Sequence, residues 1–340
     1  MKLGIVGLPA SGKTTIFETL TQNSPSGANK AENRIGMVKV PDPRVDILSE
    51  MYQPKKTIFA QVEYFLPGRQ GGSKEKAAWS QVRDCDALIL VIRNFAGYGL
   101  ENPTPVSDVQ YLNQEMILAD LIVVEKRLEM LNQEKQRGKK FNSDEYALLE
   151  TCLKTLEDET PLRDNPELAA APLLKGFTFI SGKPLLVLFN NGDEDMNSPD
   201  LSTLNRTEEL IVLRGQLEHE LAQMTVEEAR DFLEEFEIED PAMDRVIKKS
   251  YDLLGLISFF TVGEDEVRAW TIRRETVALD AADVIHSDIK KGFIRAEVLF
   301  YDDLMEAKTY QEARKKGTVR LEGKTYPVKN GDIINFRFNV

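Results

Sequence analysis

The sequence has few of the residues that build metal clusters, disulfide frameworks or hydrolytic triads. Its 340 residues include two cysteines, Cys85 and Cys152, and two histidines, His219 and His286. Two cysteines cannot form the multi-bridge framework of a small secreted protein, and they suit a reducing compartment. We expect both thiols to be structural. Without a Cys/His cluster there is no zinc signature, and two isolated histidines give no support for a Ser-His-Asp triad.

Long apolar runs and an excess of positive charge are also missing. No run approaches the roughly 20 apolar residues that cross a bilayer, so we expect no membrane association. The first residues already form a strand-like run, which predicts no signal peptide and, with the cysteine usage, a cytoplasmic protein. The formal net charge of −13 argues against broad nonspecific binding to nucleic acid, and we expect no sequence-specific DNA binding. A local contact with a ribonucleoprotein stays open.

What the sequence does contain is a complete phosphate-binding loop. Residues 7–14 read Gly-Leu-Pro-Ala-Ser-Gly-Lys-Thr, which matches GxxxxGK[ST] at every fixed position. The strand-like run Leu3–Val6 precedes it and the helix-like run Thr14–Gln22 follows it. In such loops the glycines let backbone N–H groups point at phosphate oxygens, and the helix N-terminus adds partial positive charge. The sequence therefore predicts a nucleoside phosphate site.

Two side chains of this loop have expected roles. Lys13 is placed to reach the β- and γ-phosphates, and the Thr14 hydroxyl is placed to ligate Mg²⁺. The expected phosphate-binding residues are Gly7, Leu8, Pro9, Ala10, Ser11, Gly12, Lys13, Thr14 and Thr15.

Strand-like and helix-like segments alternate through much of the chain, whose length allows two or three domains. The strand-like segments are 37–40, 58–64, 87–92, 177–180, 185–189 and 210–213, and a helix is expected at 74–83. This alternation predicts βαβ units with right-handed crossovers, and so an α/β domain with a mostly parallel sheet.

Between the two sets of strands the apolar spacing becomes helical. Ile117, Leu121, Val124, Leu128 and Leu131 repeat at 4-3-4-3 spacing, and Tyr146, Leu149, Leu153 and Leu156 continue at 3-4-3. This pattern predicts an antiparallel helical hairpin over about 112–160, inserted into the α/β domain. Asn142 followed by Glu145 reads as a capping-box-like start of the second helix. We expect the apolar stripe to be structural and the hairpin surface to be available to a partner.

The last third of the chain differs in charge and in its pattern of apolar residues. Residues 205–245 are strongly acidic, which is typical of a solvated helix face. From Ile257 onward the sequence is β-rich, with strand-like runs at Phe293–Phe300, Thr318–Leu321 and Ile333–Phe338. This segment predicts a separate small α+β domain, in which His286 is expected to be structural or partner-facing.

Several motifs resemble the YchF/Obg-like ATPase family. In the C-terminal part they are Glu266–Ile272, Val284–Asp288, Lys291–Glu297 and Asn330–Val340, and in the first half they are Gly4–Pro9, Val40-Pro-Asp-Pro-Arg44 and, more weakly, Asp84–Ala87 and Val91–Phe95. The resemblance covers essentially the whole chain. It implies a P-loop G-domain at 1–110 and 168–256, a helical hairpin insert at 111–167, and a TGS-like β-grasp domain at 257–340.

The same resemblance implies a function. Members of this family are translation-factor-class NTPases that associate with ribosomes and hydrolyse ATP, often in preference to GTP. It implies ATP or GTP with Mg²⁺ as ligands, and the ribosome or its subunits as partner through the hairpin and the TGS-like domain. The family motif Asn-x-x-Glu resembles Asn190-Asn-Gly-Asp193 or, in the other register, Asn191 to Glu194. The expected residues near the base are Phe95, Asn190, Asn191 and Asp193.

The chain departs from the family pattern where catalysis is concerned. Ala10-Ser11 stands where the family usually has Asn-Val, and Thr14 stands for its Ser. The Asp-x-x-Gly element is missing, because Gln61–Gly68 contains no Asp and Glu63 is the nearest carboxylate. Asn29–Arg34 lacks the threonine of a first switch. No catalytic water-positioning residue is identified.

These departures leave two main hypotheses. The first is a slow, divergent NTPase that works with the translation machinery. The alternative is a catalytically impaired pseudo-NTPase that acts as a nucleotide-stabilised interaction scaffold. A P-loop kinase is disfavoured, because the C-terminal segment resembles a β-grasp domain.

Overall fold

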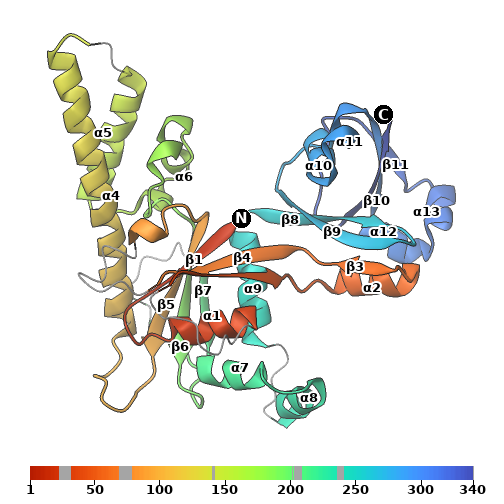
Figure 1. Cartoon of the computed structure of the whole chain (residues 1–340), viewed down its shortest axis with the longest axis horizontal. Coiled ribbons are helices and arrows are strands. Elements are labelled where there is room, and N and C mark those ends of the chain that lie inside the picture. The colour runs from red at the N-terminus through yellow and green to blue at the C-terminus, as the bar shows by residue number, and fades with distance from the viewer. Residues whose placement is uncertain are drawn as a thin grey trace. The chain divides into compact units, whose positions relative to one another are not determined.

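The computed structural model of the chain forms two compact units (Figure 1). It describes residues 1–22, 32–68, 79–139, 142–200, 202, 209–235 and 241–339. The first unit comprises Met1–Met37 and Glu63–Val246, and the second comprises Val38–Val62 and Ile247–Val340. In the described part of the chain, no helix combines the length and the apolar composition needed to cross a membrane.

A six-stranded sheet in the order β2-β4-β1-β5-β6-β7 organises the first unit. Its strands are β1 (Lys2–Val6), β2 (Arg34–Lys39), β4 (Gln61–Leu66), β5 (Ala87–Asn94), β6 (Leu185–Asn191) and β7 (Glu209–Leu213). The pairs β1–β4, β1–β5, β5–β6 and β6–β7 are parallel. Strand β6 is buried along its whole length, as expected for a central strand covered on both faces. The predicted parallel α/β sheet is confirmed.

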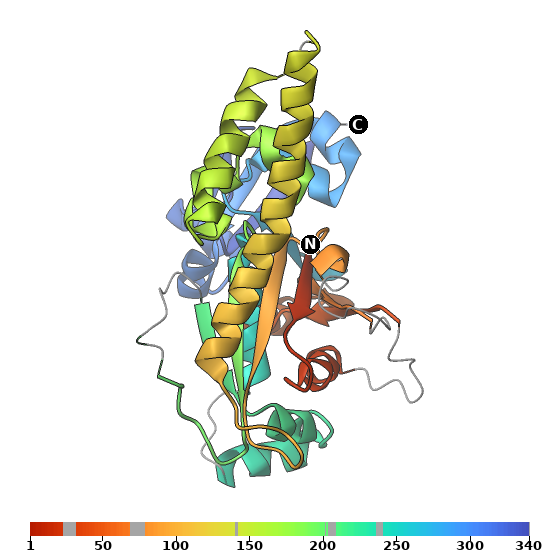
Figure 2. The same ribbon diagram turned by 90° about the vertical axis from the view of Figure 1, so that its left-hand side faces the viewer.

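The helices of this unit include the predicted hairpin. They are α1 (Lys13–Thr21), α4 (Pro105–Gln136), α5 (Ser143–Glu157), α6 (Pro166–Ala169), α7 (Gly215–Leu221) and α8 (Val226–Glu235), with 3-10 turns at Leu162–Asp164 and Pro172–Phe177. Helix α9 (Ala242–Leu253) begins in this unit and ends in the second. Helices α4 and α5 lie side by side in both views (Figure 2). Their contact buries the predicted stripe, including Val124 and Leu131 of α4 and Leu149 and Leu156 of α5. Of the expected helix at 74–83, residues 74–78 lie outside the described ranges, and residues 79–81 are helical.

The start of α5 differs in one detail from the capping-box prediction. Asn142 caps the helix, because its Oδ1 accepts hydrogen bonds from the backbone N–H groups of Asp144 and Glu145 at 3.0 and 3.2 Å. The Glu145 carboxylate does not reach back to the cap. It accepts two hydrogen bonds from Arg127 on α4, at 2.7 and 3.0 Å. The Glu145 carboxylate therefore binds Arg127 of the facing helix instead of the helix cap, and this ion pair connects α5 to α4.

A buried carboxylate anchors α4 to the segment that precedes β6. Asp120 is fully buried and accepts hydrogen bonds from the N–H groups of Ile180 and Ser181, at 3.0 and 2.6 Å. Burial raises the pKa of Asp120, and these backbone donors oppose the rise. The predicted strand at 177–180 is wrong: the chain makes a 3-10 turn and a bend there. The N–H group of Ile180 bonds a side chain instead of a sheet neighbour.

The second unit is a six-stranded sheet in the order β11-β10-β12-β8-β9-β3. Its elements are α2 (Pro43–Tyr52), β3 (Lys56–Ile58), β8 (Leu256–Val262), β9 (Glu266–Arg273), α10 (Ala278–Ile285), α11 (Ser287–Lys291), β10 (Phe293–Phe300), α12 (Tyr301–Ala307), α13 (Tyr310–Lys316), β11 (Arg320–Glu322) and β12 (Asp332–Phe338). Strand β12 pairs parallel with β8. On the other side of this pair, β12 is antiparallel to β10 and β8 is antiparallel to β9. Helix α10 packs on the sheet through Ala278 and Ala282. This strand order agrees with the expected β-grasp arrangement.

The second unit also takes in a segment from the N-terminal half, which the expected boundaries assigned to the G-domain. The predicted strand 58–64 is broken into β3 and β4, which lie in different sheets. Strand β3 pairs parallel with β9, with Thr57 opposite Val267. In the 40–44 motif, Arg44 donates to both oxygens of Asp42 and to Asn330 Oδ1, and its guanidinium lies 5.1 Å from the Phe260 ring centroid. Residues 38–62 therefore belong to the second unit because β3 pairs with β9 and Arg44 contacts Asn330 and Phe260.

Both cysteines behave as structural thiols. Cys85 and Cys152 are buried and form no disulfide. Burial raises the pKa of each thiol to about 11, so both stay neutral and unreactive near pH 7. The exposed His286 also has a local structural contact, because its Nδ1 accepts a hydrogen bond from the Asp288 N–H at the start of α11.

Candidate functional site

The phosphate-binding loop connects β1 to α1 and depends on two glycines. Gly7 has φ +151°, and a Cβ built there would lie 2.3 Å from the Val91 carbonyl oxygen of β5. Gly12 has φ +92°, and its Cβ would lie 2.2 Å from Asn190 Nδ2. Both positions therefore exclude a side chain by conformation and by contact. The loop is held against the carboxyl ends of two neighbouring strands.

Lys13 and Thr14, the residues predicted to bind phosphate and metal, are the first two residues of α1. The Lys13 ammonium donates to the carbonyl oxygens of Gly7 and Leu8, at 2.8 and 2.5 Å, so it lies across the loop. Thr14 is in the first turn of α1, whose N-cap is Gly12. The first N–H groups of a helix have no partner within the helix and suit an anion. The Ser11 hydroxyl is buried without a hydrogen-bond partner among the described residues, which fits a loop built for a polar ligand.

Asn190 joins the loop to two other strand ends. Its Nδ2 donates to the Ser11 carbonyl oxygen at 3.1 Å, and its Oδ1 accepts from the Gly215 N–H at 2.9 Å. The side chain is 5% exposed, and both ends of its amide are used. Because β1, β6 and β7 are parallel, their carboxyl ends meet at one edge of the sheet, where open α/β folds bind ligands. Asn190 thus supports the phosphate loop, whereas the sequence prediction placed it near the base.

Asn191 also supports the site instead of facing a ligand. Its Oδ1 accepts from Asn94 Nδ2 at 2.9 Å, and its Nδ2 donates to the carbonyl oxygens of Asp195 and Asn197 at 3.0 and 2.8 Å. It is 2% exposed. These bonds clamp the end of β6 to the end of β5 and to the following turn. Asn191 is predicted to contact the nucleotide, but its amide is buried and its oxygen and nitrogen already form hydrogen bonds within the protein.

Two other predicted residues lie in the turns beyond these strands. Asp193 is exposed, and its carbonyl oxygen accepts from Arg214 at 3.3 Å. Phe95 is half-buried directly after β5, and its Cβ would be 3.8 Å from a Cβ at Gly192. An exposed carboxylate and an aromatic ring therefore flank the same edge of the sheet. Their role in base binding stays a prediction.

Strand β4, in the region where the Asp-x-x-Gly element is missing, carries one carboxylate, that of Glu63. In the register of β4 with β1, Glu63 lies opposite Lys2, at the far end of β1 from the loop. At the near end, Phe65 and Leu66 are buried and apolar. In the described ranges no three His, Cys, Asp or Glu side chains gather to hold a metal. Of the predicted first switch, 29–31 lie outside the described residues, and Asn33 Oδ1 accepts from the Gly68 N–H at 2.8 Å.

Several side chains that support this site carry no recognisable motif. His219 of α7 lies 3.1 Å from Thr19 Oγ1 of α1, whose hydroxyl donates to the Thr15 carbonyl oxygen. Asn94 and Gly215 take part in the bonds described above. A polar residue at the carboxyl end of a buried parallel strand is a usable signal, and Asn94 carries it. The His219 contact has no comparable signal, because it joins positions 200 residues apart.

The loop contains one residue in a conformation that its side chain disfavours. Ala10 has φ +62°, in the left-handed region where asparagine is several-fold enriched. Ala10→Asn should therefore raise the free energy of unfolding by about 0.5 kcal/mol, because an asparagine tolerates this backbone at lower cost. Urea unfolding measures the change. Ala10→Val is the opposite control and should destabilise the protein; an Ala10→Asn variant that unfolds at lower urea than the wild type contradicts the prediction.

Comparison with known proteins gives matches along the whole chain. The family model YchF-GTPase_C, described as "Protein of unknown function (DUF933)", matches residues 256–339. The "Ribosome-binding ATPase YchF" of Bacillus subtilis is 35% identical, over 99% of this chain and 99% of the relative. The protein of the same name from Haemophilus ducreyi is 36% identical, over 100% and 99%. The structure of the Schizosaccharomyces pombe YchF GTPase matches with a TM-score of 0.87 and 30% identity, over 99% of this chain and 97% of that one.

Proposed function

This chain belongs to the YchF family, and we propose that it binds ATP or GTP with Mg²⁺ and hydrolyses it slowly in association with the ribosome. The observation that carries the proposal is the loop geometry, in which Gly7 and Gly12 admit no side chain and the Lys13 ammonium lies across the loop. Relatives named as ribosome-binding ATPases support the choice of nucleotide and partner.

The residues of the loop would have separate roles in phosphate binding. The backbone N–H groups at the start of α1 would bind phosphate oxygens, and Lys13 would neutralise their charge. Thr14 is the residue that would hold Mg²⁺, and the bound ion would supply a counter-charge to the phosphates. Asn190 would hold the loop in place, because its amide bonds both Ser11 of the loop and Gly215 at the start of α7. Hydrolysis would be attack of water on the γ-phosphorus, favoured by positioning and charge neutralisation.

Base recognition would fall to the turns after β5 and β6. Asp193 is exposed there and can accept hydrogen bonds from a base, while Phe95 offers an aromatic surface. The lysine that lies over guanine in the Asn-Lys-x-Asp motif of ordinary GTPases is replaced by Asn191, whose amide is buried in other bonds. We therefore expect weak discrimination between adenine and guanine.

A second candidate function, a nucleotide-stabilised scaffold, rests on the end of β4. Phe65 and Leu66 are buried and apolar at the end of β4 where the Asp-x-x-Gly element is missing, and Glu63 lies toward the other end of the strand. A weakly held metal would slow turnover far more than it would weaken binding of the nucleotide.

Calorimetry and single-turnover phosphate release separate these functions. We expect ATP and GTP to bind, and Mg²⁺ to strengthen binding of the triphosphates. The NTPase proposal expects slow phosphate release that requires Mg²⁺. Binding without any phosphate release supports the scaffold, and no binding of any nucleotide contradicts both.

The proposed ribosome association is tested by cosedimentation with intact ribosomes and with separated subunits. We propose the hairpin and the β-grasp domain as the contacting parts. The chain should sediment with ribosomes, and the sedimented fraction should differ between ATP, ADP and no nucleotide. A chain that stays in the supernatant under all three conditions contradicts the association.

A further inference from the structure

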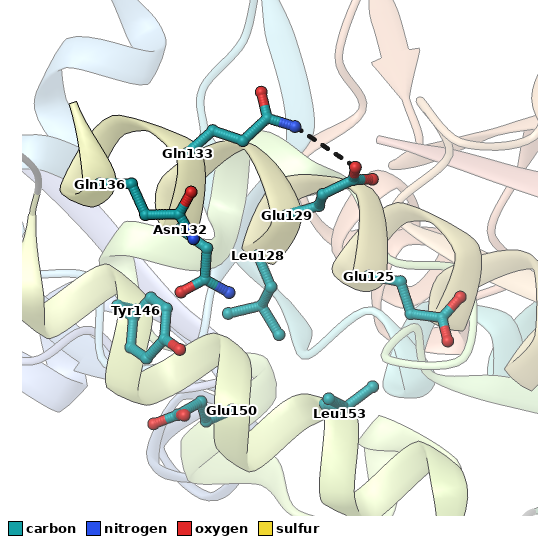
Figure 3. A pocket seen from close by; sticks show the side chains of 9 residues that line it. All are labelled: Glu125, Leu128, Glu129, Asn132, Gln133, Gln136, Tyr146, Glu150 and Leu153. Atoms are coloured by element: carbon teal, nitrogen blue, oxygen red, sulfur yellow. Dashed lines mark hydrogen bonds between the residues drawn. The ribbon is translucent and has the colours of Figure 1, made fainter.

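An open groove lies between the two helices of the hairpin (Figure 3), and none of the residues that line it belongs to the phosphate loop. Its volume is about 620 Å³. It is lined by Glu125, Leu128, Glu129, Asn132, Gln133 and Gln136 of α4 and by Tyr146, Glu150 and Leu153 of α5. We propose that this acidic groove binds a basic amphipathic helix of a partner protein.

The groove has an apolar floor and an acidic rim. Leu128 is buried, and Tyr146 and Leu153 are half-buried between the helices, where they form the floor. The three glutamates are exposed, and Glu129 Oε1 accepts a hydrogen bond from Gln133 Nε2 at 3.3 Å. Lys135 borders the groove with its ammonium 5.9 Å from the Tyr146 ring centroid. The lining itself contains three acids and no base.

The same face of α4 continues beyond the groove as an exposed apolar surface. Leu118 and Ile122 are 45% and 50% exposed. With Glu125 and Glu129 they follow a spacing of four, three and four residues, which places all four side chains on one face of the helix. Large exposed apolar side chains that adjoin a groove are typical of a binding surface. Here an apolar strip leads into an acidic groove.

Charge selects the class of partner. Exposed carboxylates repel nucleic acid phosphates, so the lining disfavours an RNA backbone. They attract Lys and Arg, and the apolar floor accepts Leu-like side chains. A helix with apolar residues at i, i+3, i+4 and i+7 and basic residues beside them satisfies both requirements. From Glu125 to Gln136 the α4 wall is about 16 Å long, which accommodates about three turns of such a helix.

This inference deepens the proposed ribosome association, because it names the kind of surface the hairpin would contact. It makes no use of the phosphate loop. Nucleotide binding and groove binding are therefore measured independently, and a failure of one leaves the other standing.

Fluorescence anisotropy with a labelled Leu/Lys helical peptide of about 15 residues tests the proposal. We expect the full chain to bind this peptide, and the affinity to fall as salt rises. Glu129→Lys combined with Glu150→Lys should weaken binding by about tenfold or more, because it turns attraction at the rim into repulsion. The matched control is Glu157→Lys combined with Asp158→Lys, which reverses the same number of charges at two exposed positions that do not line the groove. It should change the affinity by less than about twofold.

Three further measurements decide the outcome. A peptide of the same composition with scrambled periodicity should bind at least about fivefold more weakly. Circular dichroism and ATP calorimetry should show that the charge-reversal variant is folded and binds nucleotide like the wild type. The proposal is overturned if the wild type fails to bind the amphipathic peptide, if the scrambled peptide binds equally well, or if the control variant weakens binding as much. Tighter binding of oligouridine than of the peptide also overturns it.

Discussion

Replacing Lys13 with alanine should weaken ATP binding by about 100-fold, which corresponds to about 2.7 kcal/mol. The ammonium is the cation of the loop that lies across the carbonyl oxygens of Gly7 and Leu8. Removing it deletes a charge-assisted interaction with phosphate and loosens the loop that presents the backbone donors. GTP should lose a similar factor, because the effect concerns phosphates and not the base. Calorimetry with both nucleotides in the presence of Mg²⁺ measures the change.

The control for this prediction is another lysine of the same unit. Lys126 is exposed on α4, so Lys126→Ala should leave nucleotide affinity unchanged. Lys13→Ala should remain folded by circular dichroism, since it creates no cavity in the core. If phosphate release continues at the wild-type rate in Lys13→Ala, the activity does not arise at this loop. If ATP affinity is unchanged, the assignment of the site is wrong.

The phosphate loop is the part of the site that the sequence predicts best. Its geometry depends on a contiguous run of residues, so the glycines, Lys13 and Thr14 appear together in the chain and in space. The same holds for the hairpin, whose apolar stripes follow from local helical spacing. The strands β1, β5 and β6 were predictable for the same reason, because buried parallel strands are continuous apolar runs.

What the sequence could not show depends on pairing between distant segments. Nothing local indicates that Thr57 stands opposite Val267, so the assignment of 38–62 to the second unit was missed. The amide of Asn190 is equally ambiguous from the sequence. An asparagine after a strand can face a ligand or bond neighbouring loops, and only the positions of Ser11 and Gly215 show that it does the second.

Side-chain competition explains the local errors. The sequence places Glu145 in a capping box, yet Arg127 on the facing helix binds its carboxylate. The apolar run 177–180 has strand character, yet the Ile180 N–H bonds Asp120. In both cases a charged group from another helix offers a stronger hydrogen bond than the local alternative.

Asp120→Ala should lower the free energy of unfolding by about 3–5 kcal/mol. The carboxylate is fully buried, and it accepts the N–H groups of Ile180 and Ser181. It also lies 3.4 Å from the Arg83 guanidinium. Alanine would leave two buried donors without acceptors and a cation without its counter-ion, and each orphaned donor costs about 1–3 kcal/mol. Urea unfolding followed by circular dichroism measures the loss.

Asp120→Asn and Glu129→Ala complete the test. Asparagine keeps one acceptor oxygen and the shape of the side chain, so it should lose less stability than alanine. Glu129 is an exposed carboxylate on the same helix, and its removal should change the free energy of unfolding by less than about 0.5 kcal/mol. Equal losses for Asp120→Ala and Glu129→Ala would show that the Asp120 bonds do not hold α4 to the segment before β6. A large loss for alanine with a smaller one for asparagine identifies the buried backbone bonds as the anchor of the hairpin.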